Sequence, residues 1–249
     1  MLWLDIQAPF AACRPMVAGW YRPTAGFLTH SAVYGLVLNL AGVESRLGEH
    51  EAGHDGRTPA SLVRPGLPAF ALALGLPDDG GEPSVQTIYQ QLHNYPVGKD
   101  AGTDPALAMG RKNNIAPVRR ELLCEVRAIA VVDAEPAFEA AVRRGLEGGP
   151  VAGRYGLPFL GDNNFTLDRL DAIGPRPARW YALAGNAKGR PRPGTTRLTT
   201  FIDRSSMAGT RSTLFAPEAE PSDSPPDSAR VPVGDRDRFD AWLRQHQAP

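Results

Sequence analysis

The most constraining feature of the sequence is one long alternating segment at residues 119–132. Its two sides carry apolar residues at Leu122, Cys124, Val126 and Ala128 and polar residues at Glu121, Glu125 and Arg127. Alternation with a period of two is typical of a strand that buries one face. The segment therefore predicts a long β-strand.

Other segments predict the elements on either side of this strand. In chain order they are a strand at residues 2–8, a helix at 32–41, strands at 68–74 and 85–95 joined by a turn at 77–81, the strand at 119–132, a helix that opens at Pro136 and ends at Gly148 and Gly149, and strands at 179–184 and 198–202. The order strand, helix, strand, strand, helix, strand is a ferredoxin-like pattern. We therefore expect an α+β protein with a ferredoxin-like (RRM-like) domain, a scaffold of many single-strand RNA binders.

Three positions of the first helix give local expectations. Ser31 is a good N-cap, and Gly42 is a good stop after the last turn. The segment between them is apolar almost all round, so the helix should be buried. Gly35 lowers the helix propensity, which predicts close packing against a neighbour at that position.

Composition divides the chain into three regions. Residues 1–170 hold the ferredoxin-like pattern, with a long excursion of little periodicity at residues 95–118. Residues 171–215 form a smaller β-rich and basic region. Residues 216–249 combine a Pro- and Ser-rich acidic segment, expected to be a flexible linker, with a short terminal helix.

The formal charge is zero overall but is unevenly distributed. The chain has 27 Lys and Arg residues against 27 Asp and Glu residues. Eight basic residues and one acid lie between Arg176 and Arg211, whereas seven acids and three arginines lie between Glu218 and Asp240. A basic stretch beside an acidic one indicates a polyanion partner.

The composition also bounds the compartment. The longest apolar runs are about half of what a membrane span needs. Met1 leads straight into an alternating segment, without the pattern of a secretory signal. Two cysteines, Cys13 and Cys124, are too few for a disulfide framework or a four-cysteine zinc site. We expect a cytoplasmic protein that does not contact a membrane.

Motifs for metal and cofactor chemistry are weak. His50 and His54 match the H-E-x-x-H pattern of zinc proteases, in which Glu51 would be the general base. Gly53 interrupts the helix that such a site requires, and no third ligand follows at a family spacing. A zinc hydrolase is therefore a minor alternative to a solvated polar loop. The phosphate-loop and dinucleotide fingerprints are missing from the sequence, so we predict no cofactor, no metal site and no catalytic residue.

Two polar clusters carry the groups that single-stranded nucleic acid needs. The glycine-rich residues 153–165 include Arg154, Tyr155, Asn163, Asn164 and Phe165, and residues 111–120 include Arg111, Lys112, Asn113, Asn114, Arg119 and Arg120. Backbone N–H groups, arginine forks and aromatic faces suit a phosphate backbone with unstacked bases. The alternatives are a structural turn for the first cluster and a solvated basic loop for the second.

Three stretches of the sequence resemble a known family. They are Gln7-Ala8-Pro9-Phe10-Ala11 with Arg14, then Pro23-Thr24 with residues 29–36, and finally residues 120–123 with residues 154–165. They resemble the fifth CRISPR-associated protein family, the small RAMP-superfamily subunit of type I Cascade complexes, and in particular its Myxan subtype, DevS. Together the three stretches span about residues 1–170.

The resemblance implies a function and partners. Such subunits bind the 5′ handle of a CRISPR RNA, cap the filament of backbone subunits and serve RNA-guided DNA targeting in antiviral defence or guided transposition. The implied partners are the CRISPR RNA, the backbone subunit beside a β-hairpin thumb, the large Cascade subunit and target DNA. The excursion at residues 95–118 is the expected thumb. The expected RNA-binding residues are Arg14, Arg22, Thr29, His30, Ser31, Tyr95, Arg111, Lys112, Asn113, Asn114, Arg119, Arg120, Arg154, Tyr155, Asn163 and Asn164.

One branch of this family cuts precursor CRISPR RNA without a metal ion, using a Tyr, a Lys and an adjacent His. Lys112 lies in a comparable region, but Asn113 follows it where a histidine is expected. His93, His30 and Tyr34 are candidate substitutes for the missing groups. A metal-independent endoribonuclease is therefore the alternative function.

Overall fold

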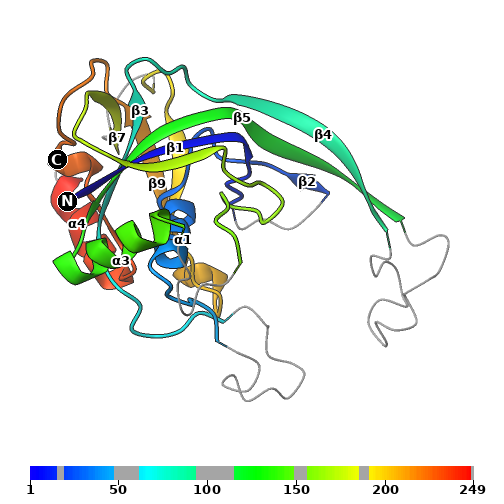
Figure 1. The fold of residues 1–249 in the computed structure, drawn as a ribbon. Helices are drawn as coiled ribbons and strands as arrows, with labels where there is room; N and C mark the ends of the chain where they lie inside the picture. Colours follow the sequence, from blue (N-terminus) through cyan, green and yellow to red (C-terminus); the bar gives the residue numbers. More distant parts are fainter. Residues whose placement is uncertain (16–19, 48–61, 94–114, 149–155, 185–190, 248–249) are drawn as a thin grey trace.

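The computed structural model describes residues 1–15, 20–47, 62–93, 115–148, 156–184 and 191–247 (Figure 1). At its centre, β1 (Leu2–Ala11), β3 (Phe70–Pro77), β5 (Ile115–Asp133) and β6 (Arg169–Ile173) lie in the order β6-β1-β5-β3. Every neighbouring pair is antiparallel. α1 (His30–Leu40) connects β1 toward β3, and α3 (Pro136–Leu146) connects β5 to β6. The predicted α+β class is confirmed, and the first five of these elements lie at predicted segments, whereas β6 falls where no strand was predicted.

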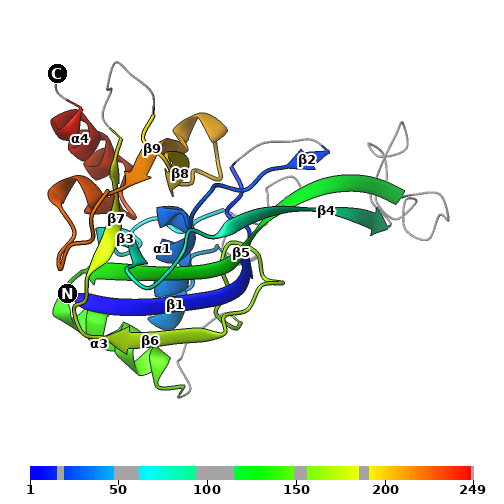
Figure 2. The same cartoon turned by 90° about the horizontal axis from the view of Figure 1, so that it is seen from above.

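Both helices cover the same face of this sheet (Figures 1 and 2). The core on that face joins residues of α1, α3 and the four central strands, among them Val33, Val37, Val142, Leu4, Leu72 and Val126. A second, smaller core lies on the opposite face. There the rings of Trp3 and Trp180 meet edge to face, with centroids 5.4 Å apart. The central sheet is thus buried on both faces.

Three further strands widen the sheet beyond β3. β7 (Ala178–Leu183), β9 (Arg211–Pro217) and β8 (Thr196–Phe201) follow β3 in that spatial order. Two of them correspond to the strands predicted at 179–184 and 198–202. Their inner side chains, including Tyr181 and Phe215, join the core that contains α1. Tyr181 stacks on Phe27 at a centroid distance of 4.1 Å, which ties these strands to the segment before α1.

A long two-stranded arm extends from the body of the protein (Figure 1). β4 (Ser84–His93) pairs with the first half of β5, from Ser84 opposite Cys124 to His93 opposite Ile115. The turn expected at residues 77–81 is present, because the Gly80 N–H donates to the Pro77 oxygen over 2.9 Å. The two strands that it joins do not pair with each other, however, since β4 pairs with β5. We call residues 84–93 and 115–124 the arm.

The arm differs from the excursion expected at residues 95–118. Its paired strands include residues 84–93, which the sequence pattern assigned to the body, and residues 94–114 lie outside the described part of the chain. β5 spans 19 residues, or roughly 60 Å at about 3.3 Å per residue. One strand of this length therefore belongs to the body and to the arm at once. β2 (Tyr21–Arg22) pairs in parallel with Arg119 and Arg120 of β5. These residues lie in the part of the arm nearer the body, residues 84–89 and 119–124, which we call the base of the arm.

The acidic C-terminal segment also differs from expectation. The stretch expected to be a flexible linker forms the 3₁₀ helix η3 (Asp227–Ala229) and β10 (Val231–Val233), which pairs with β3. The predicted short terminal helix is present as α4 (Arg236–His246). Phe239 and Trp242 of α4 are buried in the main core. Within the expected linker, Ala229, Val231 and Val233 are buried, which a composition rich in Pro and Ser does not reveal, so the prediction of a linker failed.

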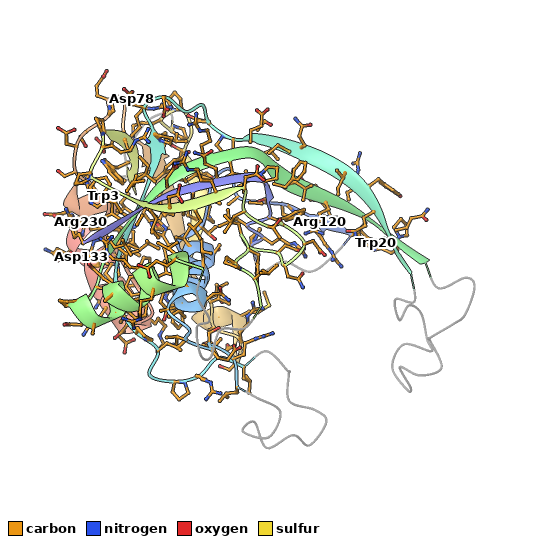
Figure 3. All side chains as sticks on the ribbon, viewed as in Figure 1. Trp3, Trp20, Asp78, Arg120, Asp133 and Arg230 are labelled. Carbon is orange, nitrogen blue, oxygen red and sulfur yellow. The ribbon has the colours of Figure 1, made fainter. Side chains whose placement is uncertain are left out.

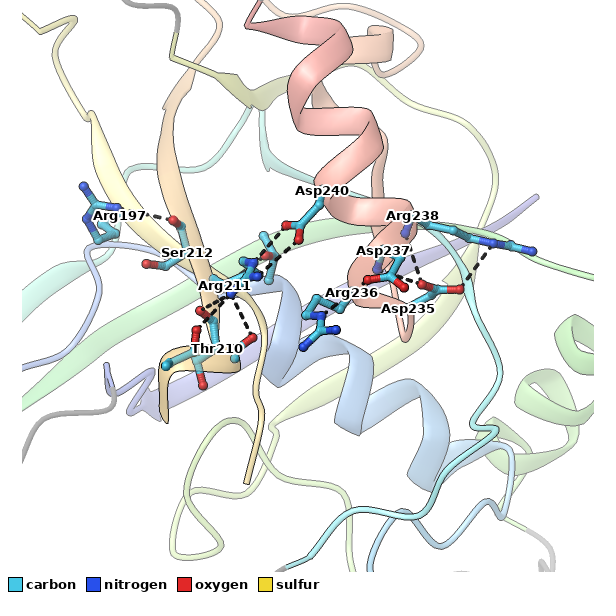
Figure 4. Close-up of polar contacts among 12 residues, drawn as sticks. Arg197, Thr210, Arg211, Ser212, Asp235, Arg236, Asp237, Arg238 and Asp240 are labelled. Atoms are coloured by element: carbon cyan, nitrogen blue, oxygen red, sulfur yellow. Dashed lines mark hydrogen bonds and ion pairs between the residues drawn. The ribbon is translucent and has the colours of Figure 1, made fainter. Parts of the chain in front are cut away.

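An acidic residue of α4 contacts the basic stretch at residues 176–211 (Figure 4). The Arg211 guanidinium, next to the 3₁₀ helix η2 (Met207–Gly209), binds both carboxylate oxygens of Asp240 at 2.8 and 3.2 Å. The same guanidinium donates to the carbonyl oxygens of Ala208 and Gly209. Arg176 is likewise paired with Asp79, at 2.9 Å. Part of the basic stretch is therefore neutralised within the protein.

The N-cap of the first helix lies two residues before its predicted position. Thr29, and not Ser31, is the N-cap, and its hydroxyl accepts the Ala32 N–H over 3.3 Å. The predicted stop is confirmed, because Gly42 follows the helix with φ +74°. Gly35 faces open space, so the close packing expected there is wrong. The close approach occurs at Gly145 of α3, where a Cβ would lie 2.0 Å from the Leu40 oxygen of α1.

These two glycines give opposite predictions for the same substitution. Gly145→Ala should lower the free energy of unfolding by about 2 kcal/mol or more, because α3 must move away from α1. Gly35→Ala should raise it by roughly 0.5–1 kcal/mol, since the site is open and alanine favours the helix. Urea unfolding of both variants against the wild type measures the difference. A Gly145→Ala protein as stable as the wild type would contradict the packing of the two helices.

Candidate nucleic-acid interface

The glycine-rich segment after α3 forms a tight turn that packs against the end of β1. Leu160 is fully buried, and its backbone bonds to Phe165 within the turn and to Ala12 after β1. Gly161 has φ +73°, and a Cβ there would lie 2.2 Å from the Ala12 oxygen. Only glycine tolerates both this backbone conformation and this approach. The alternative of a structural turn therefore holds for residues 156–165, and the turn fixes the position of Asp162.

Asp162 lies between two arginines that come from distant parts of the chain. Its Oδ2 atom accepts hydrogen bonds from Arg14, after β1, and from Arg120, in β5. Its Oδ1 atom accepts the Asn164 backbone N–H at 3.0 Å and the Asn164 side-chain amide at 2.7 Å. Burial raises the pKa of Asp162, but the Asn164 hydrogen bond and the charges of Arg120 and Arg14 outweigh burial and lower it. The carboxylate is thus ionised and fully engaged.

The two arginines of this cluster exceed the charge of its single carboxylate. Arg120 is almost fully buried and packs over the Phe165 ring at 5.0 Å. Arg14 is about one-third exposed. Burial and the neighbouring charge of Arg120 both lower the pKa of Arg14. Within the described part of the chain, the Nε atoms of Arg14 and Arg120 have no hydrogen-bond partner. The cluster therefore retains positive charge, which reaches solvent through Arg14.

Arg22 and Arg119 extend this positive charge onto the base of the arm. Arg22 lies opposite Arg120, and Arg119 lies opposite Tyr21, in the pairing of β2 with β5. Arg119 is exposed and Arg22 is partly exposed. Asn163 and Asn164 are exposed on the neighbouring turn. The structure therefore brings together six of the predicted residues: Arg14, Arg22, Arg119, Arg120, Asn163 and Asn164.

The residues at the start of α1 do not present a surface for RNA. Thr29 is buried and uses its hydroxyl as the helix cap, and Ser31 is partly exposed in the first turn. His30 is fully buried with its ring 4.8 Å from the Phe215 ring, and neither ring nitrogen has a partner among the described residues. Burial lowers the pKa of His30 to about 3. His30 is therefore a neutral core residue, and the expected direct contacts of Thr29 and His30 with RNA are not available here.

Other predicted residues lie outside the described part of the chain. They are Tyr95, Arg111, Lys112, Asn113, Asn114, Arg154 and Tyr155, together with the H-E-x-x-H pair His50 and His54. Among the described residues, no group of three or more His, Cys, Asp or Glu side chains could hold a metal ion. No helix in the described ranges is long and apolar enough to cross a membrane.

The structure describes two of the side chains that could replace the missing groups of a nuclease site, His30 and Tyr34. His30 is buried as described above. The Tyr34 hydroxyl donates to the Pro68 oxygen at 2.9 Å, and burial raises its pKa. Neither side chain is positioned to exchange a proton with RNA. For His93 the structure describes the backbone in β4, and for Lys112 it describes nothing.

Sequence reasoning missed Asp162, Trp20, Tyr21 and Tyr89. The first is the carboxylate that joins the arginines, and the three aromatic side chains are exposed at the base of the arm. The sequence contained a signal for Asp162. It is the acid of the glycine-rich residues 153–165, and the asparagines beside it are typical of local turns. The sequence contained no signal for the three exposed aromatic residues, because a strand pattern alone does not show which face of the strand other parts of the protein cover.

Comparisons with known proteins give distant structural likenesses. One solved structure, "CRISPR RNA-guided surveillance complex", contains a chain that is 14% identical over 98% of this chain and 99% of that chain, with a TM-score of 0.48. Another, "Crystal structure of Cas protein", is 15% identical over 94% of this chain and 98% of that chain, with a TM-score of 0.38. No protein-family model and no curated protein matches the sequence.

The buried His30 predicts an acid-dependent loss of stability. The unfolded chain binds a proton at this histidine near pH 6.5, whereas the folded protein binds it only near pH 3. Between these values, His30 should lower the free energy of unfolding by about 1.4 kcal/mol per pH unit. Urea unfolding at pH 7 and pH 5 should show a loss about 2 kcal/mol smaller in His30→Phe than in the wild type.

His246 provides the control for this measurement, because its ring lies in α4 and contacts the Trp242 oxygen. The acid-dependent slope of His246→Asn is measured beside that of His30→Phe to show what the loss of a histidine elsewhere does. Equal slopes in the wild type and in His30→Phe would show that His30 is not buried in the neutral form.

The Asp162 cluster predicts the cost of removing its carboxylate. Asp162→Asn keeps the size of the side chain but leaves the buried Arg120 guanidinium without a counter-charge. We expect the free energy of unfolding to fall by about 2–4 kcal/mol. Asp168→Asn makes the same chemical change at an exposed site of the same loop and should change it by less than about 0.5 kcal/mol. Similar values for the two variants, from urea unfolding, would contradict the buried ion pairs.

Proposed function

We propose that the chain is a non-catalytic subunit of a type I CRISPR Cascade surveillance complex, of the DevS kind within the fifth CRISPR-associated family. In this role it binds the 5′ handle of the CRISPR RNA and caps the filament of backbone subunits. The assembled complex then targets DNA through the guide, and the protein itself supplies backbone and stacking contacts. The proposal makes the chain a cytoplasmic ribonucleoprotein component.

One observation carries the proposal: residues from separate stretches of family resemblance meet in a single cluster. Arg14 belongs to the first stretch, and Arg120 and Asp162 belong to the third. Asp162 is 148 residues from Arg14 and 42 residues from Arg120 in the chain, yet both ion pairs share one carboxylate oxygen of Asp162. Stretches that resemble a family only by chance would not be expected to lie together in the folded protein. The convergence therefore supports a shared functional surface.

The chemistry of this surface suits a phosphate backbone. Arg14, Arg22, Arg119 and Arg120 gather where β2 meets β5, against the carboxylates Asp162 and Glu121. Arginine forks bind phosphate in two-point geometry and stack on bases. Exposed asparagines on the adjoining turn add donors and acceptors for sugar and base edges. The net positive charge lies at the base of the arm.

The arm supports the proposed contact with the neighbouring backbone subunit. The family resemblance implies a thumb inserted in a ferredoxin-like RAMP domain, and the arm projects from the corresponding connection between β3 and β5 (Figure 1). The β-rich region of β7, β8 and β9, with β10 and α4, lies on the other side of the body. We assign this region a structural role, the support of the sheet. The surfaces that remain are those that the large subunit and target DNA would contact.

Recovery of RNA with the tagged chain tests the proposal. Purified from its native cells under mild salt, the wild-type chain should bring down CRISPR RNA of uniform 5′ end together with backbone subunits. Arg14→Ala combined with Arg22→Ala should lower the recovered RNA several-fold, since each phosphate contact contributes to salt-dependent affinity. Arg236→Ala combined with Arg238→Ala, on the exposed side of α4, is the control and should leave recovery unchanged. Sequencing that finds no CRISPR RNA with the wild type would reject the proposal.

The endoribonuclease alternative is separated by a different assay. Purified chain incubated with repeat RNA in EDTA should leave the RNA intact under the proposal. Cleavage that disappears in Lys112→Ala or His93→Ala would replace the non-catalytic role by precursor processing. Elemental analysis for zinc tests the remaining alternative at His50 and His54 in the same preparation.

A further inference from the structure

Three side chains form a cross-strand ladder at the base of the arm. In the strand pairing, Arg119 of β5 lies directly opposite Tyr21 of β2 on one side and opposite Tyr89 of β4 on the other. Directly opposed residues of a sheet project from the same face. We call Tyr21, Arg119 and Tyr89 the ladder. The order across three strands is thus aromatic, cation, aromatic.

The ladder face is open to solvent, and the opposite face is covered at β5 but exposed at Ile88 of β4. Tyr21 and Tyr89 are 50% and 69% exposed, and Arg119 is exposed between them. On the other face, Val118, Arg120 and Leu122 are buried, with Arg120 against the turn that holds Asp162. Trp20, 63% exposed, adjoins the ladder, because its oxygen accepts the Arg119 N–H over 2.8 Å. Figure 3 shows Trp20 and Arg120 beside the arm.

The Tyr21 ring is held in place by its own hydrogen bonds. Its hydroxyl donates to Glu121 Oε1, and Glu121 Oε2 accepts the Thr24 N–H at 3.0 Å. The nearest carboxylate in β5 is therefore engaged and does not pair with Arg119. Within the described ranges, neither Arg22 nor Arg119 forms an ion pair. A fixed ring beside an unpaired guanidinium loses little conformational entropy when a ligand binds.

This arrangement fits successive unpaired bases of a single strand. Neighbouring strands lie about 4.8 Å apart, so the two rings stand roughly 9–10 Å apart with Arg119 between them. Aromatic faces stack on any base, and an arginine between them contacts phosphate or stacks in turn. A docked protein would also use exposed tyrosines, but Arg119, which has no ion-pair partner within the described ranges, favours an anionic ligand.

We propose that the ladder binds unpaired nucleobases of single-stranded RNA, with Tyr21 and Tyr89 as stacking faces and Arg119 as the cation between them. The inference rests on the proposed function and extends it from phosphate contacts at Arg14 and Arg22 to base contacts on a separate face. It assigns the base of the arm to the RNA.

Equilibrium binding of the full-length chain to labelled oligouridine of about eight nucleotides tests the ladder. Tyr89→Leu removes the aromatic face and should weaken binding about five-fold or more, which is the lower range for one base stack. Tyr89→Phe keeps the face and should bind within about two-fold of the wild type. Thr87→Val changes a neighbouring residue of the same exposed strand face and should bind as the wild type does.

A second measurement identifies the contact as stacking. Oligouridine in which successive bases are replaced by abasic sites should bind the wild type more weakly, and Tyr89→Leu should add little further loss. Such non-additivity is expected when the two changes remove one interaction. Fully additive losses, or equal binding by wild type and Tyr89→Leu, would overturn the ladder.

The outcomes also separate this inference from the proposed function. If CRISPR RNA is recovered with the chain but Tyr89→Leu binds RNA as the wild type does, the ladder fails and the proposed function stands. If Tyr89→Leu instead releases a protein subunit at unchanged RNA affinity, the ladder is a protein interface and the inference is overturned. If the wild type neither binds oligouridine nor recovers CRISPR RNA, both fail together.

Discussion

The pairing of β5 is the constraint on which the rest of the structure depends. On one side β5 pairs with β4 through Cys124 and with β3 from Ile129 onward, and on the other side it pairs with β2 and then β1. Leu123 and Cys124 have partners on both sides. The arm is therefore continuous with the central sheet, and its direction is set by the packing of the body.

The exchange of partners along β5 has a physical signature. Between the β4 and β3 pairings, residues 125–128 have no partner on that side in the described pairing, and Glu125 has φ +57° there. Opposite Glu125 in the register lies Pro9, which has no N–H to donate. A non-glycine residue in the left-handed region stores strain, which the flanking pairs hold in place. The change of direction between body and arm is thus built into the strand itself.

Much of the fold could be predicted because local periodicity coincides with burial. The alternation around Val126 and the apolar segment around Val37 identified β5 and α1. The errors occur where a distant contact decides. Thr29 and Ser31, two residues apart, can both cap the first helix, and the sequence alone led to Ser31 in place of Thr29. The tight helix contact falls at Gly145, which only the position of Leu40 reveals.

The candidate site shows the same division. Arg14 and Arg120 were predicted from residue type, but the carboxylate that joins them is 148 residues from Arg14 in the chain. His30 was expected to bind RNA at the start of the first helix, whereas burial against Phe215 makes it a neutral core residue. Residue type therefore indicates the chemistry, and only tertiary packing decides which side chains remain free to perform it.

The charge distribution shows how far this principle extends. Along the sequence, the strongest basic stretch lies between Arg176 and Arg211, and it points to this region as the contact for a polyanion. In the folded protein, Arg211 is occupied by Asp240 of the acidic segment and Arg176 by Asp79. At the base of the arm, by contrast, fewer arginines gather, but two guanidinium groups share one carboxylate, and Arg22 and Arg119 have no ion-pair partner within the described ranges. Exposed arginines of the basic stretch such as Arg192 and Arg204 likewise have no ion pair within the described ranges. Because a phosphate responds to the uncompensated local charge, the charge summed along the sequence does not by itself locate the nucleic-acid contact, and the smaller cluster is a candidate in its own right.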